Sequence, residues 1–223
     1  MLRNVGALLT DARWTGISGI ATLLSLVVAV VALAVTVVPA PSLFGQRPRM
    51  AIAPVAGAGE PAVHLSDLRS RATWTSGAGA IPFADNQERG ILSHECEKLE
   101  DGGRHCGFLT HPSYVDGAPR FIRGCFDLPR PIAAADRFRT TIGFPHWVRA
   151  GAGTFRVDVQ ARRGTTTTTT TVAEKPDART DGKLHQIDAP LAAHAGSQVV
   201  CLQVDAAGAD DAAFWVDPRV ERP

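Results

Sequence analysis

The N-terminal part of the chain contains one long segment without a charged side chain. No Asp, Glu, Lys or Arg occurs from Trp14 to Gln46, and residues 17–38 are mostly Ile, Leu, Val and Ala. A helix of that length, at about 1.5 Å per residue, matches the roughly 30 Å hydrocarbon core of a bilayer. A buried core helix would carry a polar face, and a cleaved signal peptide has a shorter apolar region of about 7–15 residues. We therefore predict an uncleaved transmembrane helix at residues 15–38.

Flanking charges predict the orientation of this helix. The short N-terminal side carries the free amine, Arg3 and Arg13 against Asp11, and two arginines after the helix weaken the asymmetry without reversing it. Positive charge favours the cytoplasmic side. Residues 1–14 are thus expected to be a cytoplasmic tail, and the rest of the chain is expected outside the cell membrane.

The remainder divides into a linker and one domain. Residues 39–68 begin with a stretch rich in Pro, Ala and Gly, which predicts a semi-extended spacer. The segment at residues 64–68 is an alternative start of the fold. Residues 69–223 alternate short apolar segments with turn signals and show no long helical pattern, which predicts an all-β extracytoplasmic sandwich.

Overall composition excludes some partners. The chain has 23 Lys+Arg against 22 Asp+Glu, so no excess charge indicates nucleic acid. Only three of the basic residues are lysines, and Ala, Gly and Arg are frequent. This composition is typical of a high-GC genome, such as that of an actinobacterium.

Four segments show the period-two pattern of half-buried strands. They lie near residues 121–128, 137–142, 154–160 and 200–204. Thr165 to Thr171 form an uninterrupted threonine run, whose β-branched but polar side chains favour an edge strand or a protruding hairpin. The run is interpreted as a tolerated low-complexity insertion, with ligand binding or glycosylation as alternatives.

An even number of cysteines in an oxidising compartment predicts disulfides. Cys96 and Cys106 flank a Glu-Asp-Gly-Gly turn, whereas Cys125 and Cys201 lie in two strand-like segments. Of the three possible pairings we favour Cys96–Cys106 with Cys125–Cys201.

A zinc site at His94, Cys96, His105 and Cys106 is the competing interpretation. Their spacings of one and zero intervening residues differ from the two to four of common zinc motifs. We therefore predict no metal site and no cofactor.

Catalytic motifs are weak in this sequence. Ser113 follows His111 closely and Asp116 is near, but the members of a catalytic triad come from separate elements. No nucleophile elbow, phosphate loop or H-E-x-x-H motif occurs. The sequence therefore favours a protein without catalytic residues. Trp147 fits an exposed aromatic loop and a buried core position equally well.

The C-terminal segment resembles one known family. The run Asp-Asp-Ala-Ala-Phe-Trp-Val-Asp-Pro-Arg-Val at residues 210–220 is similar to the last strand of NPCBM domains, which are galactose-binding-like β-sandwich modules found beside carbohydrate-active enzymes. Residues 136–143 and 153–159 resemble two further strands of that family, and residues 181–184 resemble its Asp-Gly turn. The likeness covers roughly residues 74–220.

The resemblance implies a jelly-roll, galactose-binding-like sandwich whose ligand loops lie at one end. It therefore nominates His146, Trp147 and Arg149 as ligand-binding residues. The function expected from it is a membrane-anchored, non-catalytic module that binds glycan or cell-envelope carbohydrate. The alternative is an envelope protein–protein interaction or structural module without a sugar ligand.

Overall fold

The computed structural model describes residues 60–84, 86–208 and 210–223. The predicted tail, the transmembrane helix at 15–38 and most of the linker lie outside these residues. Within the part described, no helix is long and apolar enough to cross a membrane.

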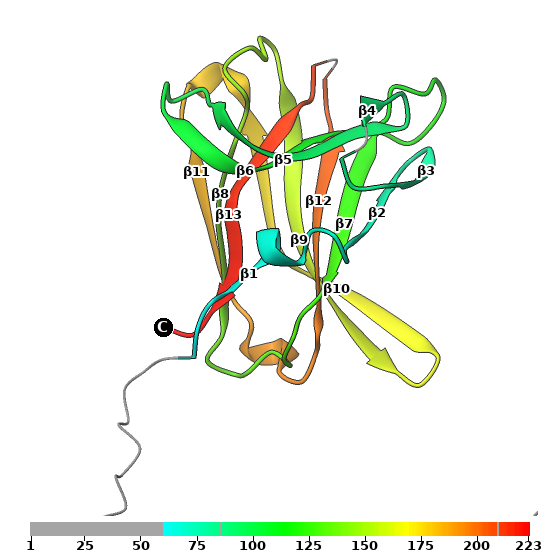
Figure 1. The fold of residues 1–223 in the computed structure, drawn as a ribbon, viewed down its shortest axis with the longest axis vertical. Helices are drawn as coiled ribbons and strands as arrows, with labels where there is room; N and C mark the ends of the chain where they lie inside the picture. The colour runs from blue at the N-terminus through cyan, green and yellow to red at the C-terminus, as the bar shows by residue number, and fades with distance from the viewer. Residues whose placement is uncertain (1–59, 85, 209) are drawn as a thin grey trace, which may run out of the picture. The chain divides into compact units, whose positions relative to one another are not determined.

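The described chain is an all-β sandwich of two sheets (Figure 1). Every strand pair is antiparallel. The strands of the first sheet, in spatial order, are β11 (His185–Pro190), β8 (Arg137–Gly143), β13 (Ala213–Glu221), β6 (Arg104–His111), β5 (Gly90–Lys98) and β4 (Asn86–Gln87), with β1 (Val63–His64) also on β13. Those of the second are β10 (Thr166–Ala178), β9 (Ala152–Arg163), β12 (Val199–Ala206), β7 (Phe121–Asp127), β2 (Thr73–Ser76) and β3 (Gly79–Ile81).

Three short 3₁₀ helices connect strands: η1 (Leu65–Leu68), η2 (Arg179–Asp181) and η3 (Ala192–His194). Leu65 is fully buried and Leu68 is 5% exposed, so both belong to the core. The sandwich therefore includes residues 63–68, in agreement with the alternative start at residues 64–68, and the linker does not extend to residue 68. The physical reason is that β1 pairs with β13, which places η1 over the core.

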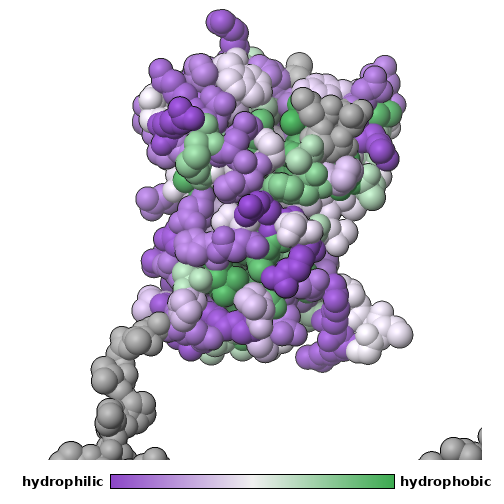
Figure 2. Space-filling model, in the orientation of Figure 1, coloured by the Kyte–Doolittle hydropathy of each residue, from purple (hydrophilic) through white to green (hydrophobic). Residues whose placement is uncertain are grey.

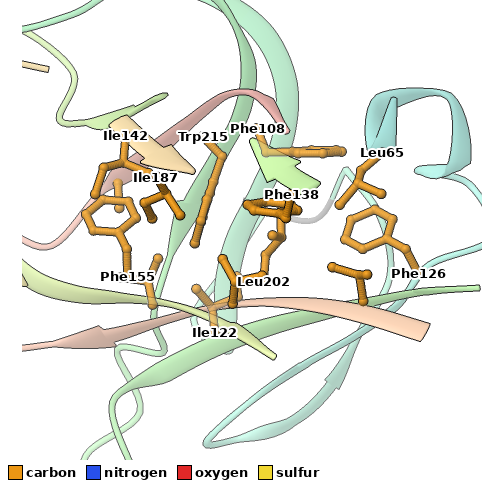
Figure 3. Close-up of a cluster of buried hydrophobic side chains, with 14 of the residues drawn as sticks. Leu65, Phe108, Ile122, Phe126, Phe138, Ile142, Phe155, Ile187, Leu202 and Trp215 are labelled. Atoms are coloured by element: carbon orange, nitrogen blue, oxygen red, sulfur yellow. The ribbon is translucent and has the colours of Figure 1, made fainter. Parts of the chain in front are cut away.

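The four predicted strands are confirmed as β7, β8, β9 and β12. Phe155, Val157 and Val159 face inward from β9, and side chains from both sheets meet in one core (Figure 3). Trp215 of β13 is fully buried there and lies edge-on to Phe155, with ring centroids 5.0 Å apart. Its neighbour Phe214 is also fully buried but lies outside this core cluster, because adjacent residues of a strand point to opposite faces.

Thr165 lies in the turn after β9, and Thr166 to Thr171 form the first half of β10. Among the described strands β10 pairs with β9 alone, so it is an edge strand. The threonine side chains are exposed, and the β9–β10 hairpin protrudes from the lower part of the sandwich in Figure 1. The predicted protruding hairpin is therefore confirmed.

Both predicted disulfides are present. Cys96 pairs with Cys106 across β5 and β6, and Cys125 pairs with Cys201 across β7 and β12. In each case the two cysteines are directly opposed in the strand register, so each bridge lies within one sheet. The alternative zinc site is excluded, because both of its thiols are in a disulfide.

Candidate functional site

One end of the sandwich, uppermost in Figure 1, gathers loops that are far apart in the sequence. These are the β6–β7 loop (112–120), the β8–β9 loop (144–151) and the described part of the β12–β13 loop (207–208 and 210–212). We call them together the loop end. Backbone hydrogen bonds tie them into one surface: Ala206 N–H donates to Arg120 O, and Ala207 N–H donates to Ala152 O.

Two buried residues anchor the β8–β9 loop in the core. Phe144 and Val148 are fully buried in the core, and Val148 N–H donates to Pro145 O. The intervening residues His146 and Trp147 therefore point outward, and the Trp147 residue is 45% exposed. The structure thus places Trp147 on the surface, which was one of the two alternatives left by the sequence.

The three nominated residues lie in this one loop. His146 Nδ1 lies 3.2 Å from Lys98 O and 3.5 Å from a Glu97 carboxylate oxygen. The Arg149 side chain is exposed, and its backbone N–H donates to Asp210 Oδ2 at 3.1 Å. Asp210 therefore joins the β8–β9 loop to the β12–β13 loop.

Tyr114, which the sequence analysis did not single out, is the second exposed aromatic residue of the loop end. It is 51% exposed and stacks on buried His111, with ring centroids 4.2 Å apart. Burial raises the pKa of the Tyr114 hydroxyl, and the nearby Asp210 charge raises it further. Tyr114 is the only tyrosine in the chain, and it lies between Pro-Ser and Val-Asp-Gly, residues that are typical of a turn. This turn pattern is the sequence signal that could have identified Tyr114 as a loop residue.

A pocket of about 250 Å³ lies beside Tyr114, lined by residues 113–118 and Arg120. The Arg120 guanidinium is fixed by Asp211, whose side chain is fully buried, at 2.8 Å. Ser113 Oγ donates to Glu88 O, whereas His111 Nδ1 bonds to Pro112 O. The hydroxyl and the imidazole are therefore engaged with separate backbone carbonyls, and they do not form a nucleophile–base pair here.

The carboxylate of Glu100, in the β5–β6 turn, contacts the backbone of the β8–β9 loop. Glu100 Oε1 accepts the Phe144 N–H at 2.9 Å, and the Glu100 side chain is fully buried. Burial raises the pKa of Glu100 to about 7, and the Asp177 and Asp181 charges raise it further against the opposing effects of the Phe144 N–H and Arg179. Burial also raises the pKa of Asp177.

A larger pocket, of about 390 Å³, lies at the opposite end of the sandwich. Polar side chains such as Gln160, Arg162 and His194 line it, and no Trp, Tyr or Phe is among the described residues around it. The face shown in Figure 2 is hydrophilic over most of its area, with hydrophobic residues in small patches. Exposed large hydrophobic side chains in the described residues are Tyr114, Val115 and Trp147, all at the loop end.

Comparisons with known proteins identify no family. No protein-family model matches the sequence, and no curated protein matches it either. Thirteen solved chains are similar in structure, and they include carbohydrate-binding modules with β-sandwich folds.

Three of these solved structures show the range of the likeness. The CBM22-1–GH10 modules of Clostridium thermocellum xylanase 10B, complexed with xylohexaose, share 12% identity at a TM-score of 0.39, over 59% of this chain and 24% of that one. A CBM28 module specific for non-crystalline cellulose shares 11% identity at a TM-score of 0.44, over 67% of this chain and 88% of that one. An adhesin domain of Lys-gingipain from Porphyromonas gingivalis shares 7% identity at a TM-score of 0.40, over 74% of this chain and 99% of that one. With TM-scores below 0.5, the description of this chain rests on its own topology and side chains.

Proposed function

We propose that the chain is a membrane-anchored, extracytoplasmic module that binds cell-envelope carbohydrate at the loop end without catalysing a reaction. The observation that carries this proposal is the position of Trp147 and Tyr114. Both rings are about half exposed on loops of the same end, and Asp210 lies close to both loops. A binding surface of this kind uses exposed aromatic rings rimmed by polar groups.

The chemistry of the loop end suits a sugar ring. The C–H face of a pyranose packs on an aromatic ring, while its hydroxyl groups need donors and acceptors at the rim. His146 and Arg149 provide donors, and Asp210 and the carbonyls of the β6–β7 loop provide acceptors. The three nominated residues therefore belong to the proposal, together with Tyr114.

The resemblance to NPCBM domains supports the same function. It implies a galactose-binding-like jelly roll with ligand loops at one end, and we adopt this finer fold assignment as part of the proposal. The described chain begins at the end of the sandwich opposite the loop end (Figure 1), so Glu60 lies away from the proposed ligand site.

A polysaccharide-binding assay tests the proposal. Purified full-length chain is screened on a glycan array and then measured against the best polysaccharide. We expect Trp147→Ala and Tyr114→Ala each to weaken binding at least tenfold, while Arg162→Ala in the opposite pocket leaves it unchanged. Loss of binding in Arg162→Ala alone would move the site to the other end.

A protein partner is the second candidate function, and β10 favours it. The strand is thirteen residues long and lies at the edge of its sheet, with exposed threonines. Such an edge offers unpaired N–H and C=O groups to an added strand. An array without any binding glycan, together with a partner captured from the envelope and released by Thr169→Pro, would favour this candidate.

A further inference from the structure

Three side chains with metal-ligating atoms converge at the connection between β10 and β11. Asp177 lies near the end of β10, Asp181 ends η2, and His185 begins β11. Gly182, with φ of +64°, reverses the chain after η2 in a conformation that favours glycine. As a result, one ligand atom from each of the three residues lies within 4.8 Å of the other two.

The distances within this group resemble those of a metal site. His185 Nε2 lies 3.3 Å from Asp177 Oδ1 and 2.6 Å from Asp181 Oδ2. Ligands at about 2.1 Å from a tetrahedral ion are about 3.4 Å apart. The contact with Asp177 already has this spacing. The hydrogen bond to Asp181 must open by less than about 1 Å, and Asp181 is free to do so because its side chain is 38% exposed.

A second, independent observation is the buried state of Asp177. Its side chain is only 1% exposed, and its Oδ2 is buried without a hydrogen-bond partner in the described residues. Oδ1 accepts the Ala178 N–H. A buried carboxylate with an unsatisfied oxygen is costly unless a cation pairs with it. Asp177 Oδ1 also lies 3.3 Å from His185 Nε2, so this buried carboxylate faces the imidazole while its second oxygen has no hydrogen-bond partner in the described residues.

The surroundings carry charges of both signs. Glu100 is fully buried, its Oε2 also has no hydrogen-bond partner in the described chain, and its nearest cationic atom is Arg179 Nη1 at 3.9 Å. Arg179, Lys175 and Lys183 supply positive charge opposite the carboxylates of Glu100, Asp177 and Asp181. The partial exposure of His185, 26%, leaves a path by which a divalent cation can enter.

We infer that Asp177, Asp181 and His185 bind one divalent transition-metal ion, with zinc as the best fit. The imidazole excludes calcium and magnesium as preferred ions, because both take oxygen ligands, whereas zinc combines imidazole with carboxylate. The ion would clamp β10, η2 and β11 together. Since Arg179 N–H donates to Gly151 O, the clamp would also hold the end of the β8–β9 loop.

Calorimetric titration of zinc into the full-length, chelator-treated protein tests the inference. We expect one equivalent to bind, and His185→Ala to weaken this binding at least 100-fold. His105→Ala is the matched control, because His105 also lies four residues after an aspartate, Asp101, at 3.0 Å and with similar exposure. Among the described residues, no third ligand completes a metal-binding group with this pair. We expect the control to change the affinity less than threefold.

A second variant separates loss of zinc binding from loss of folding. Asp177→Asn keeps the side-chain volume and removes the buried charge, so its metal-free form should melt at or above the temperature of the wild type while binding zinc at least tenfold more weakly. Zinc should raise the melting temperature of the wild type and leave that of His185→Ala unchanged. Equal binding by His185→Ala would show adventitious zinc only and overturn the inference. So would tighter binding of calcium than of zinc, or no stoichiometric binding.

Discussion

Truncation of Trp215 and of Trp147 should affect stability very differently. Trp215 is fully buried against Phe155, whereas Trp147 is 45% exposed. A buried ring of this kind removes about 150–250 Å² from water, which corresponds to about 4–6 kcal/mol at 25 cal/mol per Å². Truncation of buried Trp to Ala costs about 3–5 kcal/mol. We therefore expect Trp215→Ala to lower the free energy of unfolding by about 3–5 kcal/mol.

The expected cost for Trp147→Ala is at most half as large. About half of its surface is buried, and a truncated surface side chain leaves no closed cavity, so about 2.5 kcal/mol is the upper limit. At about 2–4 °C per kcal/mol, the melting temperature should fall by about 6–20 °C for Trp215→Ala and by less than half of that for Trp147→Ala. Differential scanning calorimetry of the full-length variants measures both values without knowledge of the ligand.

The result that refutes this reasoning is equal destabilisation by the two variants. Trp147 would then contribute to the core, and the loop end would lose one of its two candidate aromatic contacts. A Trp147→Ala variant that keeps its stability and its carbohydrate binding would instead leave the fold description intact and remove Trp147 from the proposed site.

Three further predictions concern the disulfides, pH and the anchor. Replacing Cys125 and Cys201 together by Ala should cost about 4–5 kcal/mol and replacing Cys96 and Cys106 about 3 kcal/mol, because the bridges span 76 and 10 residues; chemical denaturation showing the reverse order would contradict this. Burial lowers the pKa of His111 below its usual 6.5, so its contribution to stability is present above pH 6.5 and is lost as pH falls through the lowered pKa. In the His111→Phe variant, the melting temperature should therefore depend less on pH below 6.5 than in the wild type. The mature protein should keep its N-terminus and remain with membranes after alkaline extraction, and N-terminal sequencing that begins after the predicted helix would disprove the anchor.

The strands and the disulfides could be predicted from the sequence because their signals are local. Alternation at Phe155, Val157 and Val159 already requires one buried face, whatever that face packs against. The turn between Cys96 and Cys106 brings these cysteines together within one hairpin, and this leaves Cys125 and Cys201 for the second bridge. The threonine run likewise shows its exposure by its lack of apolar side chains.

Tertiary structure decided which residues meet at the loop end. Tyr114 and Trp147 share one end because β13 lies between β6 and β8 in the first sheet, a strand order that no local pattern encodes. The exposure of Trp147 depends on the burial of its loop neighbours in the core, so the sequence left it undecided.

The grouping of Asp177, Asp181 and His185 was also decided by tertiary structure. Asp177, Asp181 and His185 are four residues apart, a spacing that suggests nothing in a non-helical segment, and only the turn at η2 brings them together. Glu100 comes from a different hairpin, and its burial follows from the packing of that hairpin against Phe144. Local periodicity determines which residues face inward, whereas long-range strand order determines which of the outward-facing residues become neighbours.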